Sequence, residues 1–113
     1  MQDHSWIEEF PAAATVIDKK GIIIAMNAKS AATFASDGGS NLIGKSVYDC
    51  HSPSSQQKLK GLIQTEGKNI YTIEKKGVKK LIYQGPWYQS GKFSGIVELS
   101  IEIPFEMPHF IRD

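Results

Sequence analysis

Several features that would assign a chain to a class at once are scarce or absent in these 113 residues. The single cysteine excludes an internal disulfide and favours a reducing compartment. Apolar runs stay well short of the roughly 20 residues that span a bilayer, and the start, MQDHSW, has no signal-peptide pattern. The net charge is only +1, which favours neither a nucleic-acid nor a membrane partner. We therefore expect a cytoplasmic protein with no nucleic acid and no membrane among its partners.

What the chain does have is an ordinary globular composition, with 41% hydrophobic and 22% charged residues. It contains no internal repeat and no low-complexity linker, and a domain usually spans about 100 to 200 residues. The sequence therefore predicts one domain over residues 1–113.

The first two thirds of the chain predict a hairpin followed by helices. Two β-branched apolar runs, residues 12–17 and 22–26, flank a polar turn that ends in glycine. Asn27 is placed to cap a short helix, and Ser52 is placed to cap a longer one that Gly67 ends.

The last third predicts three strands. Gly85-Pro86 should bulge or break one of them, because proline cannot donate to a strand ladder. Residues 93–103 alternate, and we assign the face with Val97 to the core and the face with Glu98 to solvent. The order β-β-α-short helices-α-β-β-β predicts an α+β fold with one antiparallel sheet.

Residues 39–46 match G-x-x-x-x-G-K-[ST], the phosphate-binding loop of nucleotide hydrolases. Such a loop needs a buried strand before it and a helix after it, but the preceding residues favour helix and polar loop, and Pro53 follows closely. Nothing indicates the parallel βαβ units of these enzymes. An NTP-binding protein acting through Gly39 to Ser46 is a remote alternative, and it predicts magnesium-dependent nucleotide affinity that Lys45→Ala removes.

Cys50 and His51 form the other chemical candidate. Thiolate and imidazole ligate metals, but a closed zinc site takes four ligands, and only His4 and His109 remain, far away in the sequence. Haem takes one or two axial ligands, so His51 is a candidate axial ligand and Cys50 a lesser one. The alternative is a small buried cysteine and a polar lead-in to the helix. Adjacent side chains diverge and make a poor catalytic dyad, and we expect no enzymatic activity.

Four strings, taken in chain order, carry a family resemblance. FPAAATVIDKKGIIIAMNAKSAATF, with Asn27 at a helix-initiating asparagine, and LIGKSVYD resemble the opening hairpin and the IGK segment of the PAS domain, a sensory and ligand-binding module. GKSVYDCHSPSSQQKLKGLI resembles the GK-V-x-x-CHPPKS segment of regulatory PAS domains, and FSGIVELSIEI resembles the closing strand. The resemblance covers about residues 8–104 and implies a five-stranded antiparallel sheet with short helices packed over one face.

The chain departs from the family in three respects. Glu102-Ile103-Pro104 replaces the usual closing Asp-Ile-Thr. We expect no attached output domain, so that a signal would pass through a dimer or a partner. The flavin photoreceptor signature is absent. The helix expected near residues 53–66 lacks the histidine of haem-binding members, which leaves His51 as the haem candidate.

The resemblance implies a non-catalytic sensory module that encloses a small ligand or cofactor between helices and sheet. We expect its site to be lined by Met26, Phe34, Val47, His51, Leu59, Leu62, Ile63, Tyr83 and Val97. Signalling would use a regulatory protein partner or a homodimer, formed through the outer face of the sheet or through Trp6, Ile7 and Phe10. A ligand-free dimerisation or protein-interaction module with a filled core is the alternative.

Overall fold

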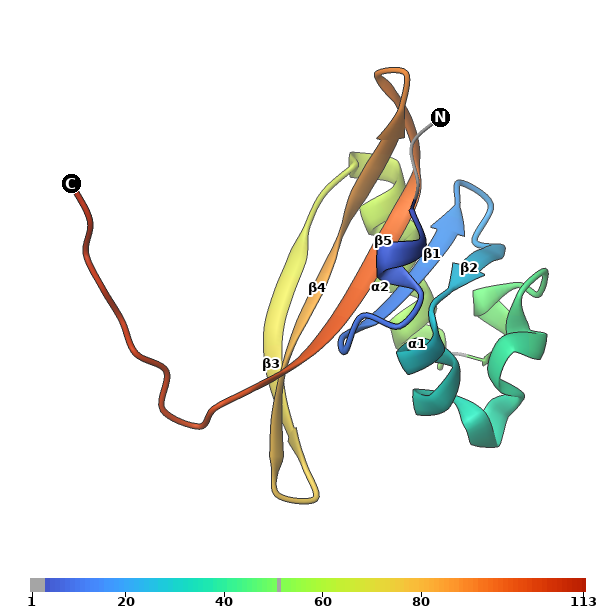
Figure 1. Ribbon diagram of the computed structural model, residues 1–113. Coiled ribbons are helices and arrows are strands. Elements are labelled where there is room, and N and C mark those ends of the chain that lie inside the picture. The colour runs from blue at the N-terminus through green and yellow to red at the C-terminus, as the bar shows by residue number, and fades with distance from the viewer. Residues whose placement is uncertain (1–3, 51) are drawn as a thin grey trace.

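The computed structural model describes residues 4–50 and 52–113, and its main feature is one five-stranded antiparallel sheet (Figure 1). The strand order is β2-β1-β5-β4-β3. The strands are β1 (Ala13–Asp18), β2 (Ile23–Met26), β3 (Asn69–Lys75), β4 (Val78–Gln89) and β5 (Lys92–Ile103). The chain order and the α+β class with a five-stranded antiparallel sheet are confirmed.

The helices lie mainly in the connection between β2 and β3. They are α1 (Ala28–Thr33) and α2 (Pro53–Thr65), with three short 3-10 turns between them, η2 (Ala35–Asp37), η3 (Gly39–Leu42) and η4 (Val47–Cys50). A further 3-10 turn, η1 (Ser5–Ile7), precedes β1. No helix in the described part of the chain is both long and apolar enough to cross a membrane.

The turn between β1 and β2 is held by Asp18. Its Oδ1 atom accepts hydrogen bonds from the backbone N–H groups of Lys20 (2.8 Å) and Ile22 (3.0 Å). Gly21 has φ = 83°, a left-handed conformation that glycine adopts without a steric penalty. The predicted hairpin is confirmed, because the two strands pair antiparallel around this turn.

Asn27 caps α1, as the sequence predicts, and also joins the helix to β1. Its Oδ1 atom accepts from the backbone N–H groups of Ser30 and Ala14, each at 3.0 Å. Its Nδ2 atom donates to the carbonyls of Ala12 (2.8 Å) and Ile7 (3.0 Å). The side chain is only 4% exposed, so these four bonds satisfy an amide that is shielded from water.

Helix α2 begins as predicted and ends one residue earlier than predicted. Ser52 is the cap, and its hydroxyl accepts from the backbone N–H of Ser55. The left-handed cap residue is Glu66, with φ = 54°, and not Gly67. The helix closes there because the N–H groups of both residues donate to the carbonyl of Leu62.

Pro86 does not break β4. The strand continues from Val78 to Gln89, and Pro86 pairs with Ile96 of β5. Pairing with β3 stops at Gln84, so at Pro86 strand β4 is paired with β5 and is open on its other edge. The N–H that proline lacks is not needed for a hydrogen bond at an open edge. The register shift falls one step later, between Trp87 and Tyr88.

The prediction for the two faces of β5 is wrong in its orientation. Ile96, the most buried large side chain at 2% exposure, and Glu98 lie on the face toward the helices. Val97 lies on the opposite, outer face. An alternating pattern separates the faces of a strand, but both faces of β5 are half-buried here, so alternation alone does not identify the inner one.

The core lies between the helices and the inner face of the sheet. Its buried members are Ile17, Ile23, Met26, Leu42, Val47, Leu59, Leu62 and Ile96. Phe34, Tyr48, Ile63 and Phe93 pack around them. The core does not fill the whole space between the layers, which leaves the cavity described next.

Candidate functional site

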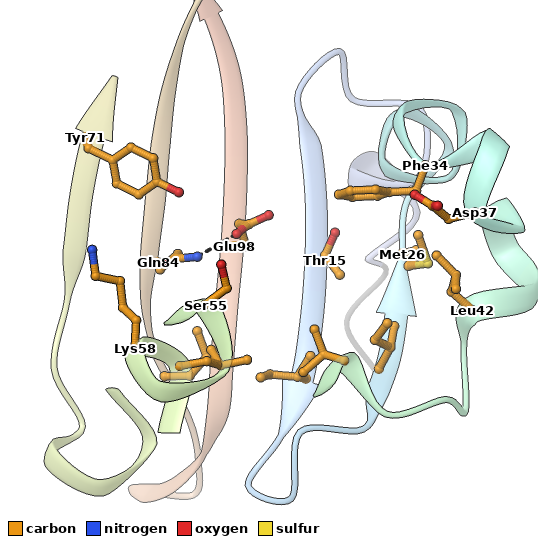
Figure 2. Close-up of a pocket in the computed structure, with 15 residues that line it drawn as sticks. Thr15, Met26, Phe34, Asp37, Leu42, Ser55, Lys58, Tyr71, Gln84 and Glu98 are labelled. Atoms are coloured by element: carbon orange, nitrogen blue, oxygen red, sulfur yellow. Dashed lines mark hydrogen bonds between the residues drawn. The ribbon is translucent and has the colours of Figure 1, made fainter. Parts of the chain in front are cut away.

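A cavity of about 280 Å³ lies between the inner face of the sheet and the helical segments (Figure 2). Strands β1, β2, β3, β4 and β5 form one wall, and α2 with the segment from Phe34 to Val47 forms the other. Its lining residues are Thr15, Ile17, Ile23, Met26, Phe34, Asp37, Leu42, Val47, Ser55, Lys58, Leu59, Tyr71, Gln84, Ile96 and Glu98.

One side of the cavity is mainly apolar. Figure 2 shows Met26, Phe34 and Leu42 together on this side, with Asp37 beside Phe34. Met26 and Leu42 belong to the buried core, and Phe34 packs against it. This side offers a small ligand an aromatic ring, a thioether and branched aliphatic groups.

The opposite side is polar, and Glu98 of β5 is its centre. Its Oε2 atom accepts a hydrogen bond of 2.7 Å from Nε2 of Gln84. Oε1 of Gln84 in turn accepts from Nδ2 of Asn69, at 3.0 Å. The three side chains come from the adjacent strands β5, β4 and β3, so the sheet register places them in a row.

Tyr71 and Lys58 add two donors to this polar side. Figure 2 shows the hydroxyl of Tyr71 directed toward Gln84 and Glu98, and the amine of Lys58 extending from α2 toward β3, below Tyr71. Burial, and then the Glu98 carboxylate, raise the pKa of Tyr71. The phenol therefore keeps its proton at neutral pH and acts as a donor.

Thr15 stands between the two sides, on β1 next to Glu98 in the sheet register. Its hydroxyl is 2.6 Å from that of Ser30, which is fully buried in α1. This pair fixes α1 against the sheet and gives the middle of the cavity a polar group.

The structure places four of the predicted ligand-site residues at the cavity, namely Met26, Phe34, Val47 and Leu59. Leu62 belongs to the adjacent core, and Ile63 packs against it, but neither lines the cavity.

Tyr83 and Val97 do not line the cavity either, because they lie on the outer face of the sheet. Their neighbours Gln84 and Glu98 line it, and successive side chains of a strand point to opposite faces. His51 and the side chain of Cys50 lie outside what the structure describes, so their predicted roles stay predictions. In the described residues, no group of three or more His, Cys, Asp or Glu side chains is placed to hold a metal.

In the loop that matches a phosphate-binding motif, backbone N–H groups are already hydrogen-bonded to carbonyls of the protein. The backbone N–H groups of Gly44, Lys45 and Val47 donate to the carbonyls of Ile23 (2.7 Å), Leu42 (2.9 Å) and Gly21 (2.8 Å). A phosphate loop needs such N–H groups free and directed at the ligand. The geometry therefore argues against the NTP-binding alternative.

The polar residues of the cavity were missed at the level of sequence. The alternation of β5 predicts a solvent-facing Glu98, and no local pattern marks Gln84 as a site residue. A polar pair opposite each other on two central strands is a detectable signal only once the register Gln84↔Glu98 is known.

Comparison with known proteins gives matches in structure and none in sequence. No protein-family model matches the chain, and no curated protein matches it by sequence. The PAS domain of an HTR-like protein from Haloarcula marismortui superimposes with a TM-score of 0.61 at 14% identity, over 88% of this chain and 87% of that one. The Aer2 receptor of Vibrio cholerae, described as a dual PAS-haem oxygen sensor, gives 0.60 at 15% identity, over 82% and 95%.

VqmA of Vibrio cholerae gives a TM-score of 0.67 at 16% identity, in a structure described as its dimer in the absence of target DNA and related to the DNA-binding mechanisms of LuxR-type receptors. The match covers 89% of this chain but only 51% of that one, or 56% in the structure of VqmA bound to DPO. The chain thus has the PAS fold, which confirms the resemblance at the level of fold. The narrower resemblance to the GK-V-x-x-CHPPKS segment stays a prediction.

The VqmA match also corrects the expectation that nucleic acid is excluded as a partner. A net charge near zero argued against it, but a DNA-binding receptor contains this fold as one part of a longer chain. The charge of one domain does not report what a neighbouring domain binds.

Proposed function

We propose that the chain is a sensory, non-catalytic module that binds a small ligand in the cavity between the helices and the inner face of the sheet. The observation that carries the proposal is the cavity itself, which is mainly apolar on one side and holds the carboxylate of Glu98 on the other. Ligand pockets in proteins are mostly apolar with a few polar groups that orient the ligand.

The fold supports the same proposal. Structures with this fold include a haem oxygen sensor and a receptor bound to DPO, which is how those proteins are described. A ligand in the cavity would gain dispersion contacts with large apolar side chains such as Phe34, Met26 and Leu42. The alternative, a ligand-free interaction module, predicts a filled core without such a cavity.

Haem is the cofactor that the sequence suggested, through His51. No histidine or cysteine is among the described residues that line the cavity, so those residues offer neither an imidazole nor a thiolate to an iron. The described part of the site does not fit haem by itself, and the proposal commits to a small ligand without iron.

Leu42 and Ile43 allow a direct test, since these neighbours differ in one respect. Leu42 is 7% exposed and lines the cavity, whereas Ile43 is 43% exposed and does not line it. We expect Leu42→Trp to fill the cavity and abolish ligand binding, while Ile43→Trp leaves it intact. The measurement is native mass spectrometry of the purified proteins, together with NMR shifts of amides around the cavity on adding a small-molecule library.

Thermal unfolding of both variants checks that they fold. Library compounds that shift the same amides in Leu42→Trp as in the native chain would contradict the proposal. So would a native chain that carries no ligand and responds to none.

We further propose that the signal passes through a second copy of the chain, which packs on the outer face of the sheet. This face carries a row of apolar side chains from four strands, which are Val16, Val97, Leu99, Leu81, Tyr83 and Ile70. Ile70 remains 54% exposed at its edge, and homodimer interfaces are distinctly apolar. The apolar outer face is therefore better suited to pack against the same face of a second copy than against a charged partner.

A further inference from the structure

Two carboxylates line the cavity, Asp37 beside Phe34 and Glu98 on the polar side, and Glu98 is the one joined to a row of hydrogen-bonded side chains. Oε2 accepts from Gln84, but Oε1 has no hydrogen-bond partner among the described residues. A carboxylate has about four acceptor sites, and a half-buried charge is stabilised by donors that replace water.

The orientation of the neighbouring amides follows from chemistry alone. An ionised carboxylate only accepts, so Gln84 must turn its NH₂ group to Glu98 and its oxygen to Asn69. Asn69 must then donate. The row of side chains therefore presents the Glu98 carboxylate to the cavity as an acceptor, with one N–H of Gln84 already bonded to it.

No cation of the described chain neutralises Glu98. The ion pair found among the described residues joins Lys29 to Glu102, with 3.8 Å between the amine nitrogen and the carboxylate oxygen. Glu102 lies four residues after Glu98 on β5. Lys58 reaches the same side of the cavity but forms no ion pair with Glu98. Its amine, on an exposed helical residue, is open to water.

From this arrangement we infer that the ligand is a small molecule with a cationic or N–H-donating nitrogen at one end, which binds Glu98, and an apolar body, which packs against Phe34, Met26 and Leu42. The inference rests on the proposed ligand-binding function and adds its chemical class. Tyr71 supplies a hydroxyl donor beside Glu98, so an acceptor atom next to the nitrogen would be recognised as well.

Three probes of similar size and shape test which ligand charge the cavity prefers. Phenethylamine carries a cation, 2-phenylethanol is neutral, and phenylacetate carries an anion. We expect phenethylamine to bind at least tenfold more tightly than the other two at pH 7, because hydrogen bonds to a charged group are worth about 1.5–3 kcal/mol. Amide shifts in NMR titrations give the three dissociation constants and locate each probe in the cavity.

Glu98→Gln is the deciding variant, and Glu102→Gln is its matched control. The amide oxygen introduced by Glu98→Gln can still accept from Gln84, so the fold is expected to persist, which thermal unfolding verifies. We expect Glu98→Gln to weaken phenethylamine binding about 10-fold to 100-fold and to leave 2-phenylethanol unchanged. Glu102→Gln removes the same charge from the same strand outside the cavity and is expected to change neither.

The outcomes separate this inference from the proposed function. If all three probes bind in the cavity equally well, or phenylacetate binds best, the nitrogen class is wrong and the ligand site stands. The inference is also overturned if Glu98→Gln and Glu102→Gln weaken phenethylamine alike. If no probe shifts any amide near the cavity at millimolar concentration, the inference and the ligand site fail together.

Discussion

At the scale of single residues, Asn27 shows how one side chain positions the site. Its four hydrogen bonds join the segment before β1, the start of β1 and the first turn of α1. Met26, the residue before it, lines the cavity, and Phe34 follows at the end of α1. The cavity wall on this side therefore depends on one buried amide.

Replacing Asn27 by alanine is expected to destabilise the protein by about 3 kcal/mol, because a helix cap is lost and buried N–H and carbonyl groups lose their partners. Asn41→Ala is the matched control, since Asn41 is exposed and its change is expected to stay within about 0.5 kcal/mol. Urea unfolding of the three proteins gives the differences. Equal midpoints for the two variants would show that the bonds of Asn27 carry no net stability.

At the scale of elements, α2 carries a local strain at its end. Glu66 adopts φ = 54°, a left-handed conformation that costs a residue with a Cβ atom, and the acidic side chain also opposes the negative end of the helix dipole. The sequence predicts Gly67 as the left-handed cap residue, but the structure has Glu66, the residue before it, in that conformation.

We expect Glu66→Gly to stabilise the protein by about 1 kcal/mol, since glycine removes the strain at the cap. Glu66→Ala removes the charge but keeps the strain, and so is expected to give a smaller gain. Thermal and urea unfolding measure both variants. A glycine variant no more stable than the alanine variant would mean that the left-handed residue is not strained.

The elements also show where sequence reasoning works and where it stops. The turn at Asp18, the cap at Asn27 and the start at Ser52 are local, because the residues that form them lie within a few positions of one another. The outer placement of Val97 is decided by which face of the sheet the helices cover, and the continuation of β4 through Pro86 by where pairing with β3 stops. No local pattern contains that information.

At the scale of the whole molecule, the sheet separates two functions. Its inner face closes the ligand cavity, and its outer face carries the apolar row proposed to meet a second copy. Strands β4 and β5 contribute side chains to both, so a ligand that contacts Glu98 lies one peptide away from Val97 and Leu99 on the other face. Such a sheet can couple the two faces through its backbone.

The proposed dimer predicts that molar mass rises with concentration in analytical ultracentrifugation. Ile70→Lys, on the outer face of β3, is expected to raise the dissociation constant at least tenfold, because it places a charge in an apolar interface. Ile73→Lys makes the same change on the opposite face of the same strand, where Ile73 is 38% exposed, and is expected to have no such effect. A monomer at every concentration, or equal effects of the two variants, would contradict the dimer.

The sequence by itself determined the fold class and the order of the elements, and it predicted four apolar residues that the structure places at the cavity, Met26, Phe34, Val47 and Leu59. These follow from hydrophobic periodicity, turn residues and caps, which act over short separations. Only the tertiary structure decided that Glu98 and Gln84 face the ligand site, that Tyr83 and Val97 face away from it, and that the phosphate-like loop is bonded to β2. The physical reason is that strand register and the choice of inner face arise from packing between residues far apart in the chain.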